Sequence, residues 1–466
     1  MPSMSKLAGA GGRPGWADLP RDLLESVLGR LPVPDRLRFP AVCTAWQSAA
    51  VVDAASAARA RPAPSPWLVL PFNPTASRRA RSVDADDGDA KFSEARFLSL
   101  AEGRAYAIRQ PAPAVPDRLC VGSSDDGWLV TADAASELHL LNPVTGAQVR
   151  LPSVATLPFV DAARDSDGRV VSYSLRCSCF GDEALVPPET LAPDRLRYEV
   201  YEKAVVLSPP RRLAPSGGWG GYAVLLICQP LFRLAVARAG DAAWAPVDTP
   251  ARCWVDAVRG GRRGVYTMDT AGRVDAWDDM DVTAPTAPRA VAPRCCCSGR
   301  ACAMSAACRK YLVELAPGHL LQVHRLRGAA HARYKWEPRP EHVEYTTTGV
   351  ELFECRTSGG GQWARVDVKD AGRVLTGRAL FLGKSASVCV PVGDGGGGGG
   401  WGHELRGNCV YFTDDGPWSH ERCHEVAPDV GVLDLADGSY RAPRGATRDL
   451  LWKWPPPVWV FPSLDS

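Results

Sequence analysis

The apolar positions near the amino terminus recur with helical spacing. Between residues 16 and 52, leucines and valines stand three to five positions apart, which places them along one face of a helix. Pro20 suits a first helical turn because its missing N–H costs nothing there. Gly29 and Pro32 are typical of a helix end. The pattern predicts a first helix whose apolar face carries Leu19, Leu23, Leu24, Val27, Leu28 and Leu31.

Two more short helical segments follow. Residues 34–39 predict a short turn, and Pro40 can open a third helix that carries Val42, Cys43 and Trp46 on one side. Domains below about 70 to 80 residues rarely build an adequate core alone. Burial of five such side chains against a partner, at roughly 1.5 to 3 kcal/mol each, gives a gross gain that can exceed the several kcal/mol lost on association. We therefore expect the apolar stripe to be a docking face for a second molecule.

From about residue 60 the pattern changes to short β-rich runs separated by Gly, Pro and Asp, with no convincing helix longer than ten residues. This predicts an all-β region with around twenty strands or more once weaker runs are counted. The clearest predicted strands are Trp67–Leu70, Gly127–Thr131, Leu138–Leu141, Val170–Leu175, Tyr198–Leu207, Tyr222–Ile227, Leu231–Ala237, Gly264–Met268, Arg273–Trp277, Tyr311–Leu315, Leu320–Arg325, Val350–Cys355, Ala379–Leu382, Cys409–Thr413 and Val430–Asp434.

A hairpin unit repeats within this region. It occurs at residues 127–141, 264–275 and 311–323, and Trp244 and Trp363 stand in matching contexts after β runs. Repeated hairpins with a periodic aromatic are typical of a β-propeller, because each four-stranded blade buries its faces only against its neighbours. The length fits six or seven blades. A large sandwich is the alternative.

Composition limits the classes of partner. The chain has 466 residues, of which 45% are apolar and 23% charged, and its formal charge is only +2. It has no long-range field for nucleic acid or acidic lipid, so we expect protein partners. No secretory signal and no apolar run of membrane-spanning length are present. The 15 cysteines have irregular spacing, which indicates a reducing, intracellular location, cytoplasmic or nuclear, rather than a disulfide framework.

No metal site is expected from the cysteine pattern. Zinc sites usually have two close pairs of ligands separated by a dozen or more residues. Cys423 and His424 are adjacent, and neighbouring residues can seldom both reach one metal ion. The central cluster has three adjacent thiols followed by gaps, which favours a loop with partly buried thiols: Cys295, Cys296, Cys297, Cys302 and Cys308, with His319 downstream.

Catalytic and cofactor motifs are also missing from the sequence. Asp414 and Asp415 are adjacent, and a strand-ending turn that accepts backbone N–H bonds is favoured over an acid–base pair. The glycine-rich segment at residues 393–400 lacks the Lys and Ser or Thr of a phosphate-binding loop. Neither Gly-x-Ser-x-Gly nor a recognisable Cys–His pair occurs. We expect no catalytic residues and no cofactor.

Residues 16–46 closely resemble the F-box. The resemblance rests on Trp16-Ala-Asp-Leu-Pro-Arg-Asp-Leu-Leu-Glu-Ser-Val-Leu28, Leu31-Pro32, Asp35-Arg-Leu-Arg-Phe39 and Val42-Cys-Thr-Ala-Trp46. It implies binding to the Skp adaptor of a Skp-cullin-F-box ubiquitin ligase. One departure from the family pattern is Pro40, which weakens docking if it lies within a helix.

The resemblance also implies which residues dock. The adaptor-facing surface and its support correspond to Leu19, Pro20, Leu23, Leu24, Val27, Leu28, Leu31 and Pro32. The remaining motif residues complete the bundle and its edge: Val42, Cys43 and Trp46.

The rest of the chain resembles the plant F-box family with a kelch-like or KIB-type propeller, also called domain of unknown function two-nine-five. The resemblance rests on Gly127-Trp-Leu129, Leu141-Asn-Pro-Val-Thr-Gly146, Leu151-Pro152, Tyr311-Leu-Val-Glu314, Leu320-Leu-Gln-Val323, Ala379-Leu-Phe-Leu-Gly383, Asn408-Cys-Val-Tyr-Phe-Thr-Asp-Asp415 and Trp459-Val-Phe-Pro-Ser463. The predicted organisation is a flexible start (1–15), an F-box (16–52), a linker (53–66) and a propeller (67–466) with mobile insertions near 77–90 and 393–400.

These features together predict a non-catalytic substrate-recognition adaptor. Its partners would be a Skp-type adaptor, cullin through that adaptor, and a target protein of unknown identity held on the propeller. Two alternatives stay open. One is a protein-binding propeller outside any ligase, with a repurposed F-box, and the other is a propeller enzyme.

Overall fold

The computed structural model describes residues 15–31, 33–50, 65–70, 92–111, 118–176, 189–213, 217–229, 232–249, 252–261, 264–278, 288–295, 308–332, 343–359, 361–367, 370–392, 405–415, 428–447, 450–451 and 457–463. The chain divides near residue 64 into two compact units. The predicted flexible start and linker lie almost wholly outside the described residues, and the insertions predicted near 77–90 and 393–400 lie wholly outside them.

The first unit is a small helical bundle. Leu24, Leu28, Phe39 and Ala49 form its core, each 8% exposed or less, and the Trp46 ring packs at 4.4 Å from the ring of Phe39. The helical segments are η1 (Trp16–Asp18), α1 (Arg21–Arg30), α2 (Val33–Arg38), η2 (Phe39–Ala41) and α3 (Thr44–Ala50).

The prediction that Pro40 opens the third helix is wrong. Pro40 lies within η2, where the N–H of Val42 donates to the carbonyl of Phe39 at 3.3 Å and closes a tight turn. The third helix begins only at Thr44, so Val42 and Cys43 precede it. Pro40 therefore interrupts no helix, and the docking weakness expected of a mid-helix proline does not arise.

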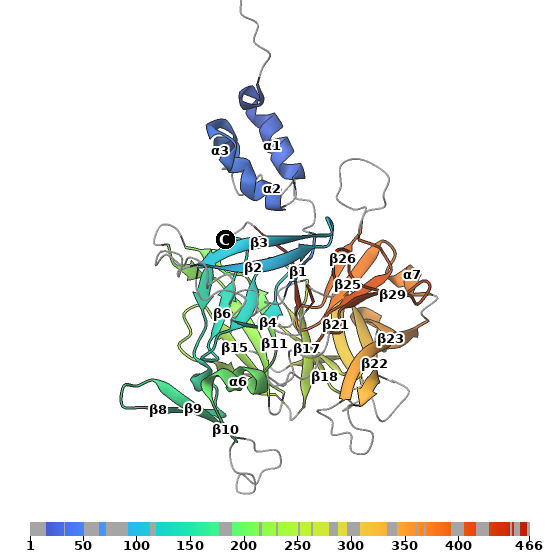
Figure 1. The fold of residues 1–466 in the computed structure, drawn as a ribbon. Helices are drawn as coiled ribbons and strands as arrows, with labels where there is room; N and C mark the ends of the chain where they lie inside the picture. Colours follow the sequence, from blue (N-terminus) through green and yellow to red (C-terminus); the bar gives the residue numbers. More distant parts are fainter. Residues whose placement is uncertain are drawn as a thin grey trace, which may run out of the picture. The chain divides into compact units, whose positions relative to one another are not determined.

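The second unit is built from six blade-like sets of strands among the described residues, which follow each other in chain order (Figure 1). Blade 1 contains β1 (Trp67–Val69), β2 (Phe92–Ser99), β3 (Arg104–Pro111) and β30 (Val458–Val460). Blade 2 contains β4 (Leu119–Ser123), β5 (Leu129–Ala132), β6 (Leu138–Leu141) and β7 (Gln148–Arg150). Blade 3 contains β11 (Tyr201–Ser208), β14 (Ala223–Cys228), β15 (Arg233–Arg238) and β16 (Ala245–Pro246). Blade 4 contains β17 (Trp254–Arg259), β18 (Val265–Asp269), β19 (Val274–Trp277) and β20 (Arg289–Ala292). Blade 5 contains β21 (Cys308–Ala316), β22 (His319–Ala332), β23 (Val343–Arg356) and β24 (Ala364–Val366). Blade 6 contains β25 (Arg378–Leu382), β26 (Val388–Pro391), β27 (Cys409–Phe412), β28 (Gly431–Asp434) and β29 (Tyr440–Arg441).

The carboxyl-terminal strand closes the unit. β30 pairs antiparallel with β1, with Trp67 opposite Val460, so blade 1 joins both ends of the β region. Separate apolar clusters fill the junctions between neighbouring blades. Trp254 and Trp277 pack with strands of blade 3, and Phe381 and Trp459 pack between blades 6 and 1. The core therefore lies between sheets that stack as blades.

The two tryptophans in matching sequence contexts occupy equivalent places. Trp244 precedes β16, and its indole N–H donates to the carbonyl of Pro152, which follows β7, at 2.9 Å. Trp363 precedes β24 and donates in the same way to the carbonyl of Pro293, which follows β20, at 3.0 Å. Each indole thus ties the outer edge of one blade to the end of the preceding blade.

Small elements interrupt the blades. Among them are the β8 (Val160–Arg164), β9 (Val170–Leu175) and β10 (Glu189–Leu191) sheet, the β12 (Arg211–Arg212) and β13 (Trp219–Gly220) pair, α6 (Pro193–Val200), α7 (Ala371–Val374), η5 (Val154–Thr156) and η8 (Thr357–Gly359). Residues 198–200 were predicted as strand but belong to α6. Pro193 in its first turn starts this helix, and Leu196 and Val200, four positions apart, pack on the core.

Candidate functional site

The first helix has more apolar surface than its own bundle covers. At about 100° per residue, Pro20, Leu23 and Val27 lie within roughly 60° of one another, beside Leu24 and Leu28. Leu24 is 1% exposed and Leu28 8%, whereas Leu23 is 49% exposed and Val27 36%. The apolar arc of α1 is therefore divided into a buried half and an uncovered half.

The other predicted docking residues divide in the same way. Leu19, Leu31 and Trp46 are partly buried against the bundle core. Val42 is 57% exposed, and Cys43 is half-buried. The structure adds two exposed apolar side chains that the sequence reasoning did not assign to the site, Leu37 and Trp16. Pro32 lies outside the described residues.

The opposite face of α1 is polar. Arg21 and Glu25 form an i,i+4 ion pair of 2.8 Å on its surface, with side chains 63% and 38% exposed. An exposed pair of this kind contributes little stability. It leaves the uncovered arc of Pro20, Leu23 and Val27 as the apolar surface of this helix.

In the second unit, called the propeller unit from here on, Asp256 of β17 contacts three other blades. Its Oδ1 lies 2.6 Å from Nζ of Lys203 on β11. Its Oδ2 accepts from the backbone N–H of Leu312 on β21 at 2.8 Å and from the hydroxyl of Ser387, before β26, at 3.0 Å. One carboxylate thereby joins blades 3, 4, 5 and 6.

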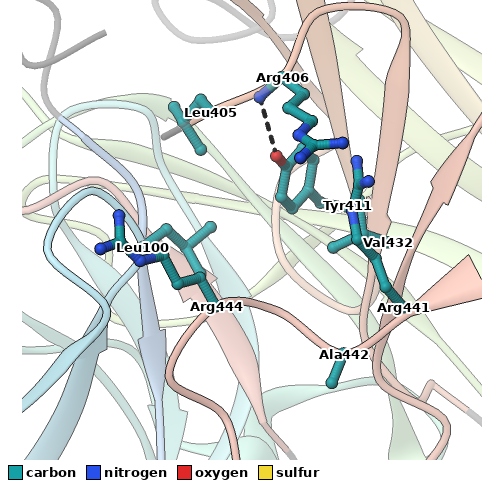
Figure 2. Close-up of a pocket in the computed structure, with 8 residues that line it drawn as sticks. All are labelled: Leu100, Leu405, Arg406, Tyr411, Val432, Arg441, Ala442 and Arg444. Carbon is teal, nitrogen blue, oxygen red and sulfur yellow. Dashed lines mark hydrogen bonds between the residues drawn. The ribbon is translucent and has the colours of Figure 1, made fainter. Parts of the chain in front are cut away.

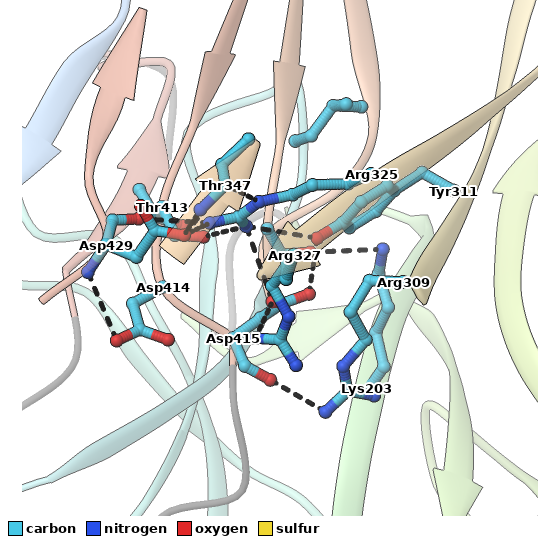
Figure 3. A network of polar contacts seen from close by, with 12 residues as sticks. Lys203, Arg309, Tyr311, Arg325, Arg327, Thr347, Thr413, Asp414, Asp415 and Asp429 are labelled. Carbon is cyan, nitrogen blue, oxygen red and sulfur yellow. Dashed lines mark hydrogen bonds and ion pairs between the residues drawn. The ribbon is translucent and has the colours of Figure 1, made fainter. Parts of the chain in front are cut away.

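A second buried network surrounds Arg325 of β22 (Figure 3). Its guanidinium lies 2.6 Å from Asp429 and 3.4 Å from Asp415, and it donates to the carbonyl of Thr413 at 2.7 Å. The hydroxyl of Tyr311 donates to Asp415 at 2.6 Å. The network connects blades 5 and 6 through charges that are almost entirely removed from water.

The pKa of Asp415 shows that this carboxylate stays ionised. Burial alone would raise its pKa, but the neighbouring Arg309, Arg325 and Arg327 outweigh burial and lower the pKa to about 2. A carboxylate with this pKa and three cationic neighbours has no tendency to take up a proton near neutral pH. Its role is structural.

The prediction of a strand-ending turn at Asp414 and Asp415 is confirmed only in that Asp414 accepts a backbone N–H. The donor is Asp429, 15 positions away at 3.2 Å, so this bond does not close a local turn. Asp415 pairs instead with the buried side chains of Tyr311 and Arg325. Arg325 and Tyr311 lie 90 and 104 positions from Asp415 in the sequence, so spacing along the chain cannot indicate these contacts.

A hollow of about 940 Å³ opens where the first strands of blades 2, 3 and 4 end. Because β4 and β11 run parallel, their carboxyl ends lie at the same edge of the unit. The lining is mixed, with Arg259 and Glu314 among its charged groups. Burial raises the pKa of Glu314, which also accepts from the backbone N–H of Gly318 at 3.0 Å. The hollow is a candidate binding surface.

Cysteine and other candidate metal ligands can be assessed only among the residues that the structure describes. Among them no group of three or more His, Cys, Asp or Glu side chains is placed to hold a metal ion. Cys295 is buried and Cys308 half-buried, as the sequence predicted for these thiols, but Cys308 begins strand β21 and does not lie in the predicted loop. Cys296, Cys297, Cys302 and the Cys423–His424 pair lie outside the described residues. No helix of the described chain is long and apolar enough to span a membrane.

Two family models match the chain. The F-box domain matches residues 16–51, and the KIB1-4 beta-propeller matches residues 97–434. No curated protein matches significantly.

Three of the solved structures that match show weak likenesses to this chain. A putative 6-phosphogluconolactonase from Bacteroides uniformis is 14% identical to this chain, with a TM-score of 0.27. The match covers 66% of this chain and 82% of the phosphogluconolactonase chain. The WD40 domain of SCAP from fission yeast is 9% identical with a TM-score of 0.24, covering 82% and 90%. YCF48 bound to D1 peptide is 11% identical with a TM-score of 0.23, covering 58% and 77%. TM-scores this low support no argument.

Proposed function

Because this chain belongs to the KIB1-4 beta-propeller family and carries an amino-terminal F-box domain, we propose that it is the substrate-recognition adaptor of a Skp-cullin-F-box ubiquitin ligase. The observation that carries the proposal is the uncovered apolar arc of α1 within the F-box match. Leu23 and Val27 stand half-exposed beside a core that is already filled by Leu24 and Leu28. A Skp-type adaptor is the partner that would cover this arc.

The exposed side chains contribute favourable free energy to docking when a partner covers them. Complete burial of a Leu or Val side chain is worth roughly 1.5 to 3 kcal/mol. Leu23, Val27 and Val42 expose 49%, 36% and 57% of their surface, so a partner that covers them regains a part of that energy for each. Leu24, Leu28 and Phe39 act as support, because they hold α1 against the other helices.

The propeller unit would capture the target protein. Buried ion pairs hold its blades together, and the hollow of about 940 Å³ lies where loops from several blades meet. An adaptor acts by proximity: holding a target near a charged conjugating enzyme raises its effective concentration without any chemistry of the adaptor's own. We propose an intracellular, non-catalytic role. A plant source and a kelch-like relationship stay predictions from the sequence resemblance.

Purification of the complex from its native cells tests the proposal. The expected result is a stoichiometric complex with a Skp-type adaptor and cullin, and proximity labelling with the proteasome blocked would identify the target. A native complex that contains neither the Skp adaptor nor cullin would overturn the proposal in favour of a binding protein outside any ligase.

A further inference from the structure

A smaller groove of about 350 Å³ lies between blade 6 and the β2–β3 turn of blade 1 (Figure 2). It lies wholly within the propeller unit. Its lining combines basic and apolar side chains and contains no Asp or Glu: Leu100, Leu405, Arg406, Tyr411, Val432, Arg441, Ala442 and Arg444.

Three arginines give this groove a positive charge. Arg406 and Arg444 are exposed. Arg406 forms no ion pair with any residue that the structure describes. Arg441 is the more constrained of the three, because its guanidinium lies 3.5 Å from Asp434 and 3.3 Å from Sγ of Cys409. Asp434 is thus the carboxylate that constrains Arg441.

The floor of the groove is apolar and well supported. Leu100 and Val432 are each 2% exposed. The ring of Tyr411 stacks on Phe381 at 4.6 Å, and its hydroxyl accepts from the backbone N–H of Arg406 at 3.2 Å. That hydrogen bond fixes the backbone from which the Arg406 side chain extends.

The opposite wall is held by a close backbone contact. Gly103 and Gly445 both have positive φ, and a Cβ on Gly445 would lie 2.2 Å from the carbonyl oxygen of Gly103. The aliphatic part of Arg444 lies over Gly103, where a Cβ would meet its Cγ at 3.0 Å. The base of the Arg444 side chain is therefore positioned by the wall.

We propose that this groove binds an acidic segment of the captured protein, with an anionic side chain held by Arg406 and Arg444 and a neighbouring apolar side chain on the floor formed by Leu100 and Val432. Guanidinium groups bind carboxylate and phosphate oxygens through paired N–H donors. The identity of the occupant as the ligase target rests on the proposed function. Carboxylate and phosphorylated side chains share the required chemistry.

Size and charge favour a peptide segment. The volume is near the lower end of the range of ligand pockets, roughly 300 to 1,000 Å³, so it suits a few side chains and not a folded domain. A net charge of +2 over 466 residues supplies no long-range positive field for attracting nucleic acid. The positive charge here is local.

The test measures peptide binding to the purified full chain by fluorescence anisotropy. The probes are labelled heptapeptides with two glutamates beside one varied apolar residue, the same peptides with phosphoserine replacing glutamate, and versions with lysine replacing glutamate. We expect binding of an anionic set, weakening as salt rises from about 50 to about 500 mM. Stronger binding of the phosphoserine set would assign the groove to phosphorylated segments.

The variant Arg406→Glu/Arg444→Glu should weaken anionic peptide binding at least about tenfold, while Arg233→Glu, an exposed arginine on blade 3, should change it less than about twofold. Arg441 is left unchanged because it pairs with Asp434. No binding of either anionic set, equal binding of the lysine set, or unchanged binding by the double variant overturns the proposal.

Skp-adaptor binding by the same variants separates the two proposals. The groove variant should retain it. A wild-type chain that binds anionic peptide but no Skp adaptor contradicts the ligase proposal and leaves the groove standing, whereas the reverse result contradicts the groove alone.

Discussion

Lys203 of blade 3 and Asp256 of blade 4 form an ion pair of 2.6 Å between Nζ and Oδ1, with side chains only 5% and 1% exposed. Both Asp256 oxygens are occupied, since Oδ2 accepts from Leu312 and Ser387. A buried ion pair of this kind is costly to break from one side, because the remaining charge has neither water nor a partner. The contact therefore makes the assembly of blades 3 to 6 depend on one carboxylate.

Removing this carboxylate should destabilise the propeller unit strongly. We expect Asp256→Ala to lower the free energy of unfolding by about 3 to 5 kcal/mol, as for other buried pairs broken from one side. Glu351→Gln is the control, because Glu351 pairs with Arg365, whose side chain is 64% exposed, and such pairs are worth about 0 to 1 kcal/mol. Urea denaturation followed by tryptophan fluorescence measures both. Equal shifts in the two variants would contradict the role given to Asp256.

Gly122 should be intolerant of any side chain. It lies where β4 pairs parallel with β11, opposite Ala204, and a Cβ would stand 2.0 Å from the Ala204 carbonyl oxygen. Gly122→Ala must separate the two strands and should lower the thermal midpoint clearly. Gly349→Ala in β23 is the matched control, since no atom lies within 4 Å of its Cβ position. Similar thermal midpoints of the two variants would show that the pairing of blades 2 and 3 does not depend on the close contact between Gly122 and Ala204.

The closing strand should depend on Trp459. This side chain is completely buried, and its indole N–H donates to the carbonyl of Leu382 at 3.1 Å. We expect Trp459→Ala to cost about 3 to 5 kcal/mol through the cavity it leaves, and Trp459→Phe to cost less because the ring contact with Phe381 is partly kept. Limited proteolysis and thermal melting would reveal the opening. A Trp459→Ala variant as protease-resistant as wild type would contradict closure through β30.

Acid should destabilise the protein through His324. This imidazole is buried on β22, and its Nε2 lies 3.0 Å from Oε1 of Gln322. Burial, with a smaller effect of Lys310, lowers the pKa of His324 from 6.5 to about 3. Between pH 6.5 and about pH 3 the unfolded state binds more protons than the folded state. The contribution of the neutral His324 to the free energy of unfolding is therefore fully present above pH 6.5. It is lost as the pH falls through this window, by at most about 1.4 kcal/mol per pH unit.

The control for this effect is His324→Gln, which cannot titrate there. Urea midpoints measured from pH 7 to pH 4.5 should fall more steeply for wild type than for this variant. Asp415, with a pKa of about 2, begins to lose its contribution only below about 3.8, which lies outside the measured range from pH 7 to pH 4.5. Parallel pH profiles would exclude His324 as the cause.

Local sequence patterns were enough to predict most of the fold. The run from Asn142 to Gly146 forms the predicted turn, in which the side-chain Oδ1 of Asn142 accepts from the N–H of Val144 and Thr145. The hairpins around β5–β6, β18–β19 and β21–β22 pair as predicted. Turn residues and strand alternation act over a few positions, so one sequence reveals them.

Contacts between distant residues could not be predicted in this way. Lys203 and Asp256 carry no sequence signal that they meet, and the arginines of the groove come from segments on either side of β27 and β28. Within the helical bundle, helical spacing put Leu23 and Leu24 in one apolar face. Only packing decides that Leu24 is buried while Leu23 stays half-exposed.

The most direct test of the central claim is the affinity of the full chain for a Skp-type adaptor, measured with Leu23→Asp/Val27→Asp against Gln47→Asp. Leu23 and Val27 are outside the bundle core, so the double variant should keep its helical circular dichroism, yet lose adaptor binding at least about 100-fold, because two charges would be buried in an apolar contact. Gln47, exposed on α3, should tolerate the same acidic residue with little change. Adaptor binding by the folded double variant at wild-type affinity would contradict the account.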